Sequence, residues 1–540
     1  MTLRGSSRKH AKVGGAASGR PRWYARGVQL SPRATALLGL VVFAVSLGLI
    51  LLRYLVPVPV GASNQGDGYR ATCTLGLIPE THGFPRFYSF LLAELNPDPV
   101  QCTNTVEAYW TSQTLLLDLG RPLTHLLGLK GEINLLAVGL ICCLIASVAI
   151  AAMAMALRVS LAARVAVAAL VWLIVADAAY FDYFASPVGE AVGVLGILLI
   201  CAGIPLLGRG FMAGFPALVM IGGGGMLAVG SKTQLLVLTV PVIAILLFRT
   251  VRIGNLRGRV ARLLAPRVLG AVAALGVITV GALSYQSQQT HDRYIRMNPV
   301  DTIFSGIVDG KHDTAGDLEF LGLPQEWSKY AGYHFWSHRQ KISRDPRYQE
   351  FQDQLTLGNV AQYWLHHPGR ALEVAQLRGQ QLLGLRPDYL GSYAPSAHKQ
   401  PKEQEHRVTF FTTAAQSVKG AGLFLLVPLW AGSTWIGLRA LRRGLRRGGT
   451  HLDRSLGTML LFLVTAAVSQ YLIAAFAEAI ENEKHMVFAS FSTLMLLPVL
   501  LTVFCAGRIR RQQRALAVPS QTRVLPRPSA ASNIPENSWS

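Results

Sequence analysis

Residues 133–156 read INLLAVGLICCLIASVAIAAMAMA and contain no charged side chain. A helix needs about 20 mostly apolar residues to cross roughly 30 Å of hydrocarbon. Similar apolar blocks recur along the chain, at residues 34–52, 165–181, 187–207, 212–229, 234–248, 268–286, 421–438, 456–476 and 486–506. The sequence therefore predicts an all-α integral membrane protein with about ten transmembrane helices.

The overall composition agrees with a membrane protein. Of 540 residues, 51% are hydrophobic and only 15% are charged. Soluble domains usually carry charge on about a quarter of their residues. Because the apolar residues also come in blocks of membrane-spanning length, we expect membrane lipid, and not a soluble core, to surround them.

The positive charge of the chain lies beside these blocks. Lys and Arg outnumber Asp and Glu by 51 to 29. Such an excess can indicate nucleic-acid binding, but basic residues next to apolar blocks are typical of cytoplasmic loops. We therefore expect no nucleic acid as a partner. Two clusters carry much of this charge: Arg249, Arg252, Arg257, Arg259, Arg262 and Arg267, and Arg439, Arg442, Arg443, Arg446 and Arg447.

The same rule predicts the organisation of the chain in the cell membrane, with both termini in the cytoplasm. If the basic arm lies in the cytoplasm, alternating crossings place all the remaining basic loops on the cytoplasmic side too. The predicted parts are a disordered basic arm (1–33), a membrane region of seven helices (34–286) with an extracytoplasmic loop (57–132), a large extracytoplasmic loop region (287–419), a membrane region of three helices (420–507) and a disordered tail (508–540).

One pair of blocks allows two interpretations. Residues 212–229 contain four consecutive glycines, and residues 234–248 contain Pro241. They form either a hairpin with Ser231 and Lys232 at its outer tip or one broken helix. A single crossing would place the basic segment 249–267 outside, so the charge rule favours the hairpin.

The two extracytoplasmic loop regions are expected to contain interfacial helices. Apolar residues recur at helical spacing over 360–385, which predicts one or two helices. A further interfacial helix is predicted over 115–129, broken at Pro122. Cys73 and Cys102 lie in the first loop, where an oxidising compartment favours a disulfide between them.

Charged residues at the outer ends of the spans predict a polar site there. The middles of the spans are nearly free of charge, whereas an ion-coupled transporter usually places acids near the midplane. The expected substrate-binding residues are Asp182, Lys232, Glu478, Glu481, Lys484 and His485.

The string NQGDGYR, residues 64–70, follows the first span. Glycines on both sides of Asp67 predict a tight turn that exposes its carboxylate. Such a carboxylate can take a proton from a sugar hydroxyl, and Arg70 is close enough to meet a phosphate. The alternative is a polar turn without catalytic function.

An exposed Asp in the first outer loop, soon after the first span, resembles the GT-C class of membrane glycosyltransferases. These enzymes use polyprenyl-phosphate-linked sugars at the extracytoplasmic face. The strings NPVD (298–301), LGLP (321–324) and HPGR (367–370) are similar to the hexose transferases of bacterial surface-layer glycan biosynthesis. The resemblance covers most of the chain in layout, but its motifs are short.

The resemblance implies roles for the outer residues. Asp67 matches the catalytic acid of the first loop and would act as general base, while Arg70, with Lys232, Lys484 or His485, would hold the lipid phosphate. The implied partners are a polyprenyl-phosphate sugar and a glycan acceptor. A second acidic motif of the class is not placed, so a divalent metal ion stays open as a cofactor.

Three other functions remain open at this point. A glycan ligase or polymerase would also join lipid-linked sugars on the outer side. A flippase or transporter for lipid-linked glycans would line its spans with cations, which these spans lack. A non-catalytic scaffold of an envelope complex would tolerate loss of the outer carboxylates.

Overall fold

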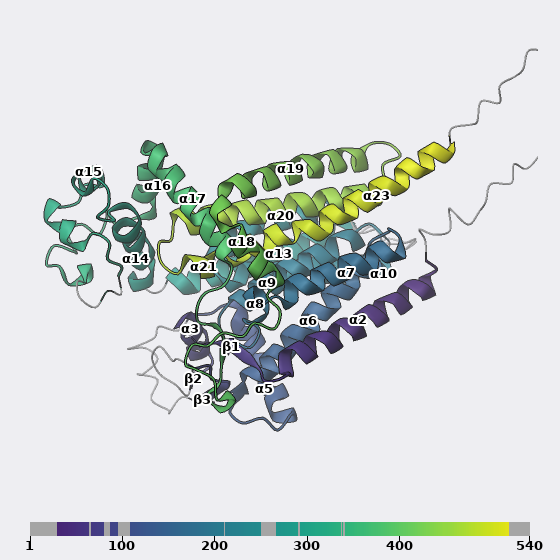
Figure 1. Cartoon of the computed structure of the whole chain (residues 1–540), viewed down its shortest axis with the longest axis horizontal. Coiled ribbons are helices and arrows are strands. Elements are labelled where there is room, and N and C mark those ends of the chain that lie inside the picture. Colours follow the sequence, from purple (N-terminus) through teal and green to yellow (C-terminus); the bar gives the residue numbers. More distant parts are fainter. Residues whose placement is uncertain are drawn as a thin grey trace, which may run out of the picture.

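A computed structural model describes residues 30–63, 66–79, 87–94, 109–209, 211–249, 266–289, 292–335, 337 and 341–517. The described chain forms an elongated bundle of helices (Figure 1). The first residues of α2 (Pro32–Leu55) and the last residues of α23 (Leu496–Ala517) lie at one end of this bundle. The short elements that follow α2 lie at the other end.

Within the part of the chain that the structure describes, seven helices are long and apolar enough to cross a membrane. Besides α2, they are α6 (Leu135–Ala156), α10 (Phe211–Ser231), α13 (Pro266–Gln289), α19 (Leu423–Leu445), α20 (His451–Phe476) and the consecutive α22 (Val487–Leu494) and α23. The prediction of a mostly helical chain with many candidate spans is confirmed.

Shorter apolar helices occupy the three remaining predicted positions. They are α7 (Leu161–Ala176), α9 (Glu190–Gly203) with η1 (Ile204–Leu206), and η2 (Thr233–Leu238) with α11 (Thr239–Phe248). Pro241 lies in the first turn of α11, where its missing N–H costs no hydrogen bond. The total of ten crossings stays a prediction.

The predicted terminal segments fall mostly outside the described residues. The helix α23 continues to Ala517, past the predicted start of the tail at residue 508, and a disordered tail stays a prediction. The sequence there, RIRRQQRALA, consists almost entirely of residues that favour helix. The helix therefore extends beyond its apolar segment.

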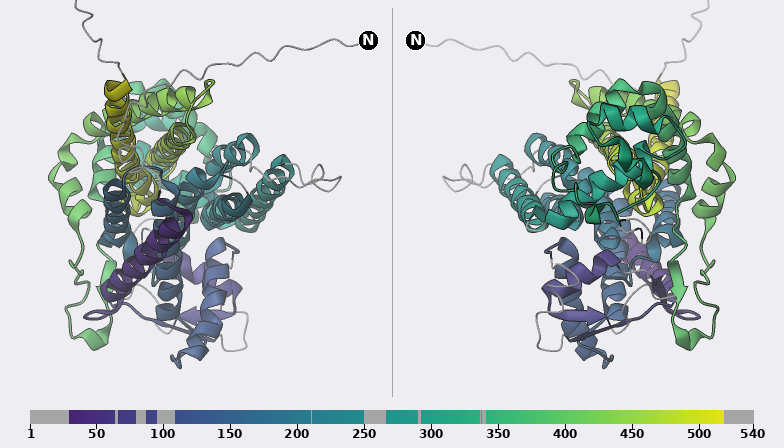
Figure 2. Two further views of the ribbon diagram at one scale, coloured as in Figure 1. Left: turned by 90° about the vertical axis from the view of Figure 1, so that its right-hand side faces the viewer. Right: turned by 90° about the vertical axis from the view of Figure 1, so that its left-hand side faces the viewer.

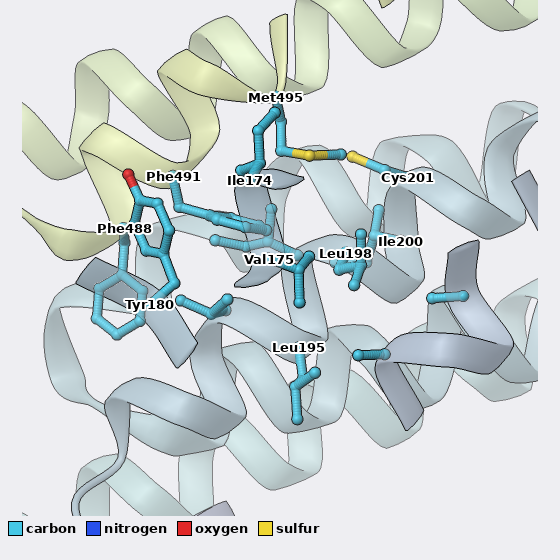
Figure 3. Packing of buried hydrophobic residues seen from close by; sticks show 14 of the residues in the cluster. Ile174, Val175, Tyr180, Leu195, Leu198, Ile200, Cys201, Phe488, Phe491 and Met495 are labelled. Carbon is cyan, nitrogen blue, oxygen red and sulfur yellow. The ribbon is translucent and has the colours of Figure 1, made fainter. Parts of the chain in front are cut away.

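The centre of the bundle is an apolar core between α7, α9 and α22 (Figure 3). Ile174 from α7, Leu195 and Leu198 from α9, and Phe488 and Phe491 from α22 have 0 or 1% exposed surface. The α9 helix is buried along its whole length, since other helices pack around it. Apolar side chains thus fill the middle of the bundle.

The four consecutive glycines of α10 allow very close helix packing. A Cβ at Gly224 would lie 2.7 Å from the carbonyl oxygen of Gly196 in α9, and a Cβ at Gly196 would lie 2.6 Å from that of Gly224. Small residues let helix backbones approach in this way. Gly225 faces Val242 of α11. The α10 and α11 helices therefore pack side by side, with Gly225 at their contact. That they cross the membrane as a hairpin stays a prediction.

The helices predicted in the two loop regions agree only in part with the structure. The helix α5 (Ser112–Leu126) runs through Pro122, so the predicted break is wrong. Its packing against α6 and α10 holds the helix despite the lost backbone hydrogen bond. The helices α16 (Leu357–His366) and α17 (Pro368–Gly384) confirm the prediction over 360–385. They separate at Pro368, which begins the second helix.

The described residues between 292 and 366 form a subdomain with a core of its own around Phe304, Trp327 and Tyr363. It lies at the end of the bundle opposite the last residues of α23 (Figure 1). Its elements, besides α16, are α14 (Asp292–Asp301), η3 (Thr302–Ile307), α15 (Thr314–Phe320), η4 (Gln325–Tyr330) and η5 (Ile342–Arg344).

Short strands join the two loop regions, which the sequence did not predict. The strand β1 (Val60–Ala62) pairs antiparallel with β5 (Leu390–Tyr393), with Val60 opposite Tyr393. The chain around β5 runs along one flank of the molecule to reach β1 (Figure 2). A second sheet has the order β2 (Leu77–Pro79), β3 (Leu91–Glu94), β4 (Ile133–Asn134).

The remaining described elements are short helices near the same end of the bundle. They are α3 (Gly66–Thr74), α8 (Ala178–Phe181), η6 (Pro395–Ala397), α18 (Phe410–Ser417), η7 (Lys419–Ala421) and α21 (Asn482–His485).

Candidate functional site

The predicted catalytic residue Asp67 lies in the first turn of α3. It is therefore helical and not part of the predicted tight turn. The side chain of Asp67 lies outside the part of the chain that the structure describes, so its catalytic role stays a prediction.

The backbone at the start of α3 is nevertheless described, and it packs closely against another segment. A Cβ at Gly68 would lie 2.5 Å from Cγ of Pro187. Pro187 belongs to the segment between α8 and α9. Only a residue without a side chain fits so close a contact. The segment that carries Asp67 thus lies against residues 182–189.

Tyr183 from this segment lies at the centre of several polar groups. Its hydroxyl interacts electrostatically with Tyr389, Glu190, Lys484 and Glu481, which come from three other segments. Burial raises the pKa of Tyr183 well above its usual range, so the hydroxyl stays protonated. Within the described residues this hydroxyl has no hydrogen-bond partner. It is therefore a buried donor beside two ion pairs.

Lys232 forms the first of these ion pairs. Its Nζ lies 2.5 Å from Oε1 of Glu190. Lys232 occupies the bend between α10 and η2, and Glu190 begins α9. The pair is held beside the next segment by Gln234, whose Nε2 donates to the carbonyl oxygen of His485 at 3.2 Å.

The turn between α20 and α21 forms the second pair. Nζ of Lys484 lies 3.0 Å from Oε2 of Glu481, and the Lys484 side chain is only 7% exposed. Glu481 has a φ of +50°, which is uncommon for a residue other than glycine. His485 Nδ1 lies 2.5 Å from Glu478, which closes the same turn. Backbone conformations of this kind are frequent at functional sites.

A cavity of about 510 Å³ opens beside this turn. Its wall includes Ser63, which comes shortly before α3 in the chain, and residues from α17, from the segment after it, from the turn before α21 and from α21 itself. Three cations and three carboxylates contribute to the lining. The lining residues are Ser63, Arg378, Gln381, Pro387, Asp388, Tyr389, Lys402, Ala479, Glu481, Asn482, Glu483 and Lys484.

Arg378 is a lining residue that sequence reasoning missed. It is 8% exposed, and its Nη1 donates to Oε1 of Gln381 at 2.7 Å. A signal was present, because Arg378 shares a helix face with the apolar residues Ala375 and Leu382. A charged residue within an apolar stripe of a helix indicates either a buried ion pair or a polar site.

Asp182, one of the predicted substrate-binding residues, belongs instead to a buried ion network. Its carboxylate lies 3.0 Å from Arg53 at the end of α2 and 2.8 Å from Arg386. Arg53 also pairs with Glu405, which accepts from Arg407 at 2.9 Å. Burial raises the pKa of Asp182, while the two guanidinium groups oppose that rise. Since its side chain is 0% exposed, Asp182 supports the fold and does not line the cavity.

The ion network fixes one wall of the cavity. Arg386 directly precedes the lining residues Pro387, Asp388 and Tyr389. Gly391 has a φ of +78°, and a Cβ there would lie 2.4 Å from Oδ2 of Asp182. Glycine is thus required where this segment passes over the network.

The remaining predicted residues have the following positions. Arg70 lies one turn after Asp67 on α3, with its guanidinium 4.2 Å from the ring centroid of Tyr109. Its contact with a lipid phosphate stays a prediction. Cys73 is disulfide-bonded, whereas Cys102 lies outside the described residues. Lys232, Glu478 and His485 lie next to the cavity without lining it.

A metal site is not formed by the described residues alone. Among them, no three His, Cys, Asp or Glu side chains are placed to hold a metal ion. Because the Asp67 side chain lies outside this part of the chain, the divalent ion stays an expectation.

Comparison with known families gives one extensive match. The family described as the YfdI N-terminal transmembrane domain matches residues 25–522 of the 540. The chain belongs to this family. It is thus a transmembrane protein, as the apolar helices indicate. A search of curated proteins found no match.

One similar solved structure is an oligosaccharyltransferase from Archaeoglobus fulgidus, crystallised with a tethered acceptor peptide that contains the NVT sequon. The identity is 11% and the TM-score is 0.33. The match covers 88% of this chain and 50% of that enzyme, so the chain spans half of the length of the oligosaccharyltransferase.

Proposed function

We propose that this protein is a membrane glycosyltransferase of GT-C type. It would move a hexose from a polyprenyl-phosphate donor to an envelope glycan acceptor at the extracytoplasmic face of the cell membrane. The observation that supports this proposal best is the cavity at one end of the helix bundle. Buried cations line it. The lining residue Ser63 lies shortly before the segment that carries Asp67 in the chain.

The lining chemistry suits a lipid-linked sugar phosphate. Arg378 and Lys484 are both mostly buried, so their contact with phosphate oxygens would be little screened by water. Arginine can contact a phosphate with two parallel hydrogen bonds. Each cation stabilises the charge that develops on the departing phosphate. The polyprenyl chain would lie along exposed apolar side chains of the helices.

In the proposed reaction, Asp67 takes the proton of an acceptor hydroxyl. The hydroxyl oxygen then attacks the anomeric carbon of the donor hexose. The bond from this carbon to the phosphate oxygen breaks, and polyprenyl phosphate leaves with the electron pair. Inversion at the anomeric carbon follows from a single displacement. Tyr183 does not line the cavity; its buried hydroxyl would help to position Lys484 for the phosphate.

The proposed topology has ten crossings and cytoplasmic termini. Two features support it: the beginning of α2 and the end of α23 lie at the same end of the bundle, and the cavity lies near its other end. The more specific assignment to hexose transfer in surface-layer glycan biosynthesis rests on the short strings at 298–301, 321–324 and 367–370.

A flippase is the second candidate from another class. It would need a polar path through the membrane. Apolar side chains of α7, α9 and α22 fill the middle of the bundle, which favours the transferase.

The first prediction concerns Asp67. Asp67→Asn should reduce hexose transfer by at least about a hundredfold, because loss of a general base usually costs 10²–10⁴-fold. Transfer is measured with membranes, radiolabelled polyprenyl-phosphate hexose and envelope glycan, at equal protein levels. The matched control is Asp118→Asn, which changes an exposed carboxylate on α5.

A second arm tests the described part of the site. Tyr183→Phe keeps the buried ring and removes only the hydroxyl, so transfer should fall while thermal stability is retained. Unchanged transfer in Asp67→Asn would contradict the mechanism, and transport of intact lipid-linked glycan by vesicles with the purified protein would favour the flippase.

A further inference from the structure

A second cavity lies in the outer part of the molecule, away from the residues considered so far. Its volume is about 580 Å³. It is formed by α15, α16 and the beginning of α17. The lining residues are His312, Asp313, Gly316, Asp317, Glu319, Phe320, Tyr363, His367 and Arg370.

One wall of this cavity is aromatic. Tyr363 stacks on His367 with 4.1 Å between ring centroids. Phe320 stands edge-on to both rings, at 5.5 Å from Tyr363 and 4.9 Å from His367. Although its neighbours form the subdomain core, Phe320 remains 40% exposed. An exposed aromatic side chain therefore borders a polar cavity.

Asp317 is the key polar residue. It is 6% exposed. Its Oδ1 accepts a hydrogen bond from the Tyr363 hydroxyl at 2.5 Å. Its Oδ2 accepts no hydrogen bond from any described residue and lies 3.6 Å from Nη1 of Arg370. Since buried polar atoms are nearly always hydrogen-bonded, an acceptor oxygen without a hydrogen bond on a residue that lines a cavity points to a ligand with donor groups.

Arg370 is fixed in place by several contacts. Its Nη2 donates to the carbonyl oxygen of Ile307 at 3.1 Å and lies 3.8 Å from Asp309. Asp309 also lies 3.1 Å from Nδ1 of His312. The cavity therefore presents a rigid arrangement of donors and acceptors.

The charges of the lining disfavour an anionic ligand. Three carboxylates, from Asp313, Asp317 and Glu319, face a single arginine. In the first cavity, by contrast, three cations balance three carboxylates. A metal ion is also disfavoured, because the described residues form no group that could hold one.

The geometry points to a binding subsite for a neutral saccharide of the acceptor glycan. Sugar hydroxyls donate to carboxylates and accept from arginine, and the C–H face of a pyranose ring packs against an aromatic side chain. Pockets for such ligands combine an apolar surface with a few fixed polar groups.

The helix α17 connects this subsite to the first cavity. Arg370 lies near its beginning, and Arg378 lies eight residues later. At 1.5 Å per residue this separation is about 12 Å along the helix. An acceptor bound at Phe320 and Asp317 would extend along α17 toward the first cavity. This role of the subsite rests on the proposed glycosyltransferase function.

The test measures binding without transfer. Full-length protein in nanodiscs is titrated by calorimetry with the neutral oligosaccharide fraction released from the envelope of the producing cells, and separately with the acidic fraction. Phe320→Ala and Asp317→Asn should each weaken binding of the neutral fraction about tenfold or more, as expected for loss of a hydrogen bond to a charged group or of a stacking contact. Leu357→Ala is the control, since it removes an exposed apolar side chain of α16 outside the cavity.

The outcomes separate the two proposals. Asp67→Asn should bind the neutral fraction like the wild type while its hexose transfer falls at least about a hundredfold. If Phe320→Ala weakens binding but the wild type shows no hexose transfer, the subsite stands and the proposed function fails. Equal binding by Phe320→Ala and wild type, no binding of the neutral fraction by the wild type, or tighter binding of the acidic fraction would overturn the subsite. Phe320 is partly exposed, so its variant keeps the test valid if Asp317→Asn does not fold.

Discussion

Asp301, at the end of α14, carries a buried carboxyl that accepts a hydrogen bond from the Phe335 backbone at 2.5 Å. Burial raises its pKa to about 6, from 3.8, and the nearby carboxylate of Glu478 adds to the rise. The folded state thus binds this proton more tightly than the unfolded state. The contribution of the protonated Asp301 carboxyl to the stability of the folded state is complete below about pH 4. It is lost as the pH rises through 6.

A variant can isolate this contribution. Asp301→Asn should be more stable than the wild type at pH 7, by up to about 3 kcal/mol, because each pKa unit corresponds to about 1.4 kcal/mol. The difference should vanish near pH 4. Fluorescence-detected thermal unfolding of detergent-purified protein between pH 4 and 7 measures it. Parallel pH profiles for the two proteins would show that this carboxyl does not titrate as argued.

At the scale of elements, the contact between α9 and α10 depends on glycine. Gly224→Ala should destabilise the protein by about 1–3 kcal/mol, the usual cost of overpacking, because the added Cβ meets a backbone oxygen of α9 that cannot move aside. Gly223→Ala is the matched control: no atom lies within 4 Å of a Cβ there. Thermal stability of the two purified variants is compared. Equal stabilities would mean that the helices are not in close contact.

At the scale of the molecule, the Arg53–Asp182–Arg386 network joins α2, the segment after α8 and the segment after α17. Arg386→Gln leaves Asp182 buried with one cation fewer, which should cost about 3–5 kcal/mol. Because the network fixes a wall of the first cavity, hexose transfer should fall in the same variant. Lys399→Gln breaks an exposed ion pair with Glu403 and should cost less than about 1 kcal/mol. Similar melting temperatures for both variants would argue against a structural role of the network.

The proposed topology can be tested on whole cells. A cysteine introduced at Lys399, near the first cavity, should react with a membrane-impermeant maleimide. One introduced at Arg446, in the basic loop between α19 and α20, should react only after the cells are permeabilised. Labelling of position 446 in intact cells would reverse the proposed orientation. The background variant lacks Cys505, the most accessible free cysteine among the described residues.

Local sequence features predicted much of the fold. The apolar blocks coincide with seven candidate spans and three shorter helices, because membrane-spanning length and apolarity are properties of a continuous segment. The spacing over residues 360–385 likewise predicted α16 and α17. The ends of helices depend on more than apolar length. Helix propensity extends α23 to Ala517, and packing allows α5 to continue through Pro122.

The sequence by itself determined that this is a helical membrane protein with charged residues gathered near the ends of its helices. Only the tertiary structure decided what each charge does. Lys484 and Glu481 line a cavity, whereas Asp182 belongs to a buried ion network. Arg378 and Asp317 line cavities, although the sequence analysis did not name them as site residues. The reason is that hydropathy and spacing act along the chain. A binding site depends on which distant segments meet. The strands β1 and β5, for example, pair although more than half of the chain lies between them.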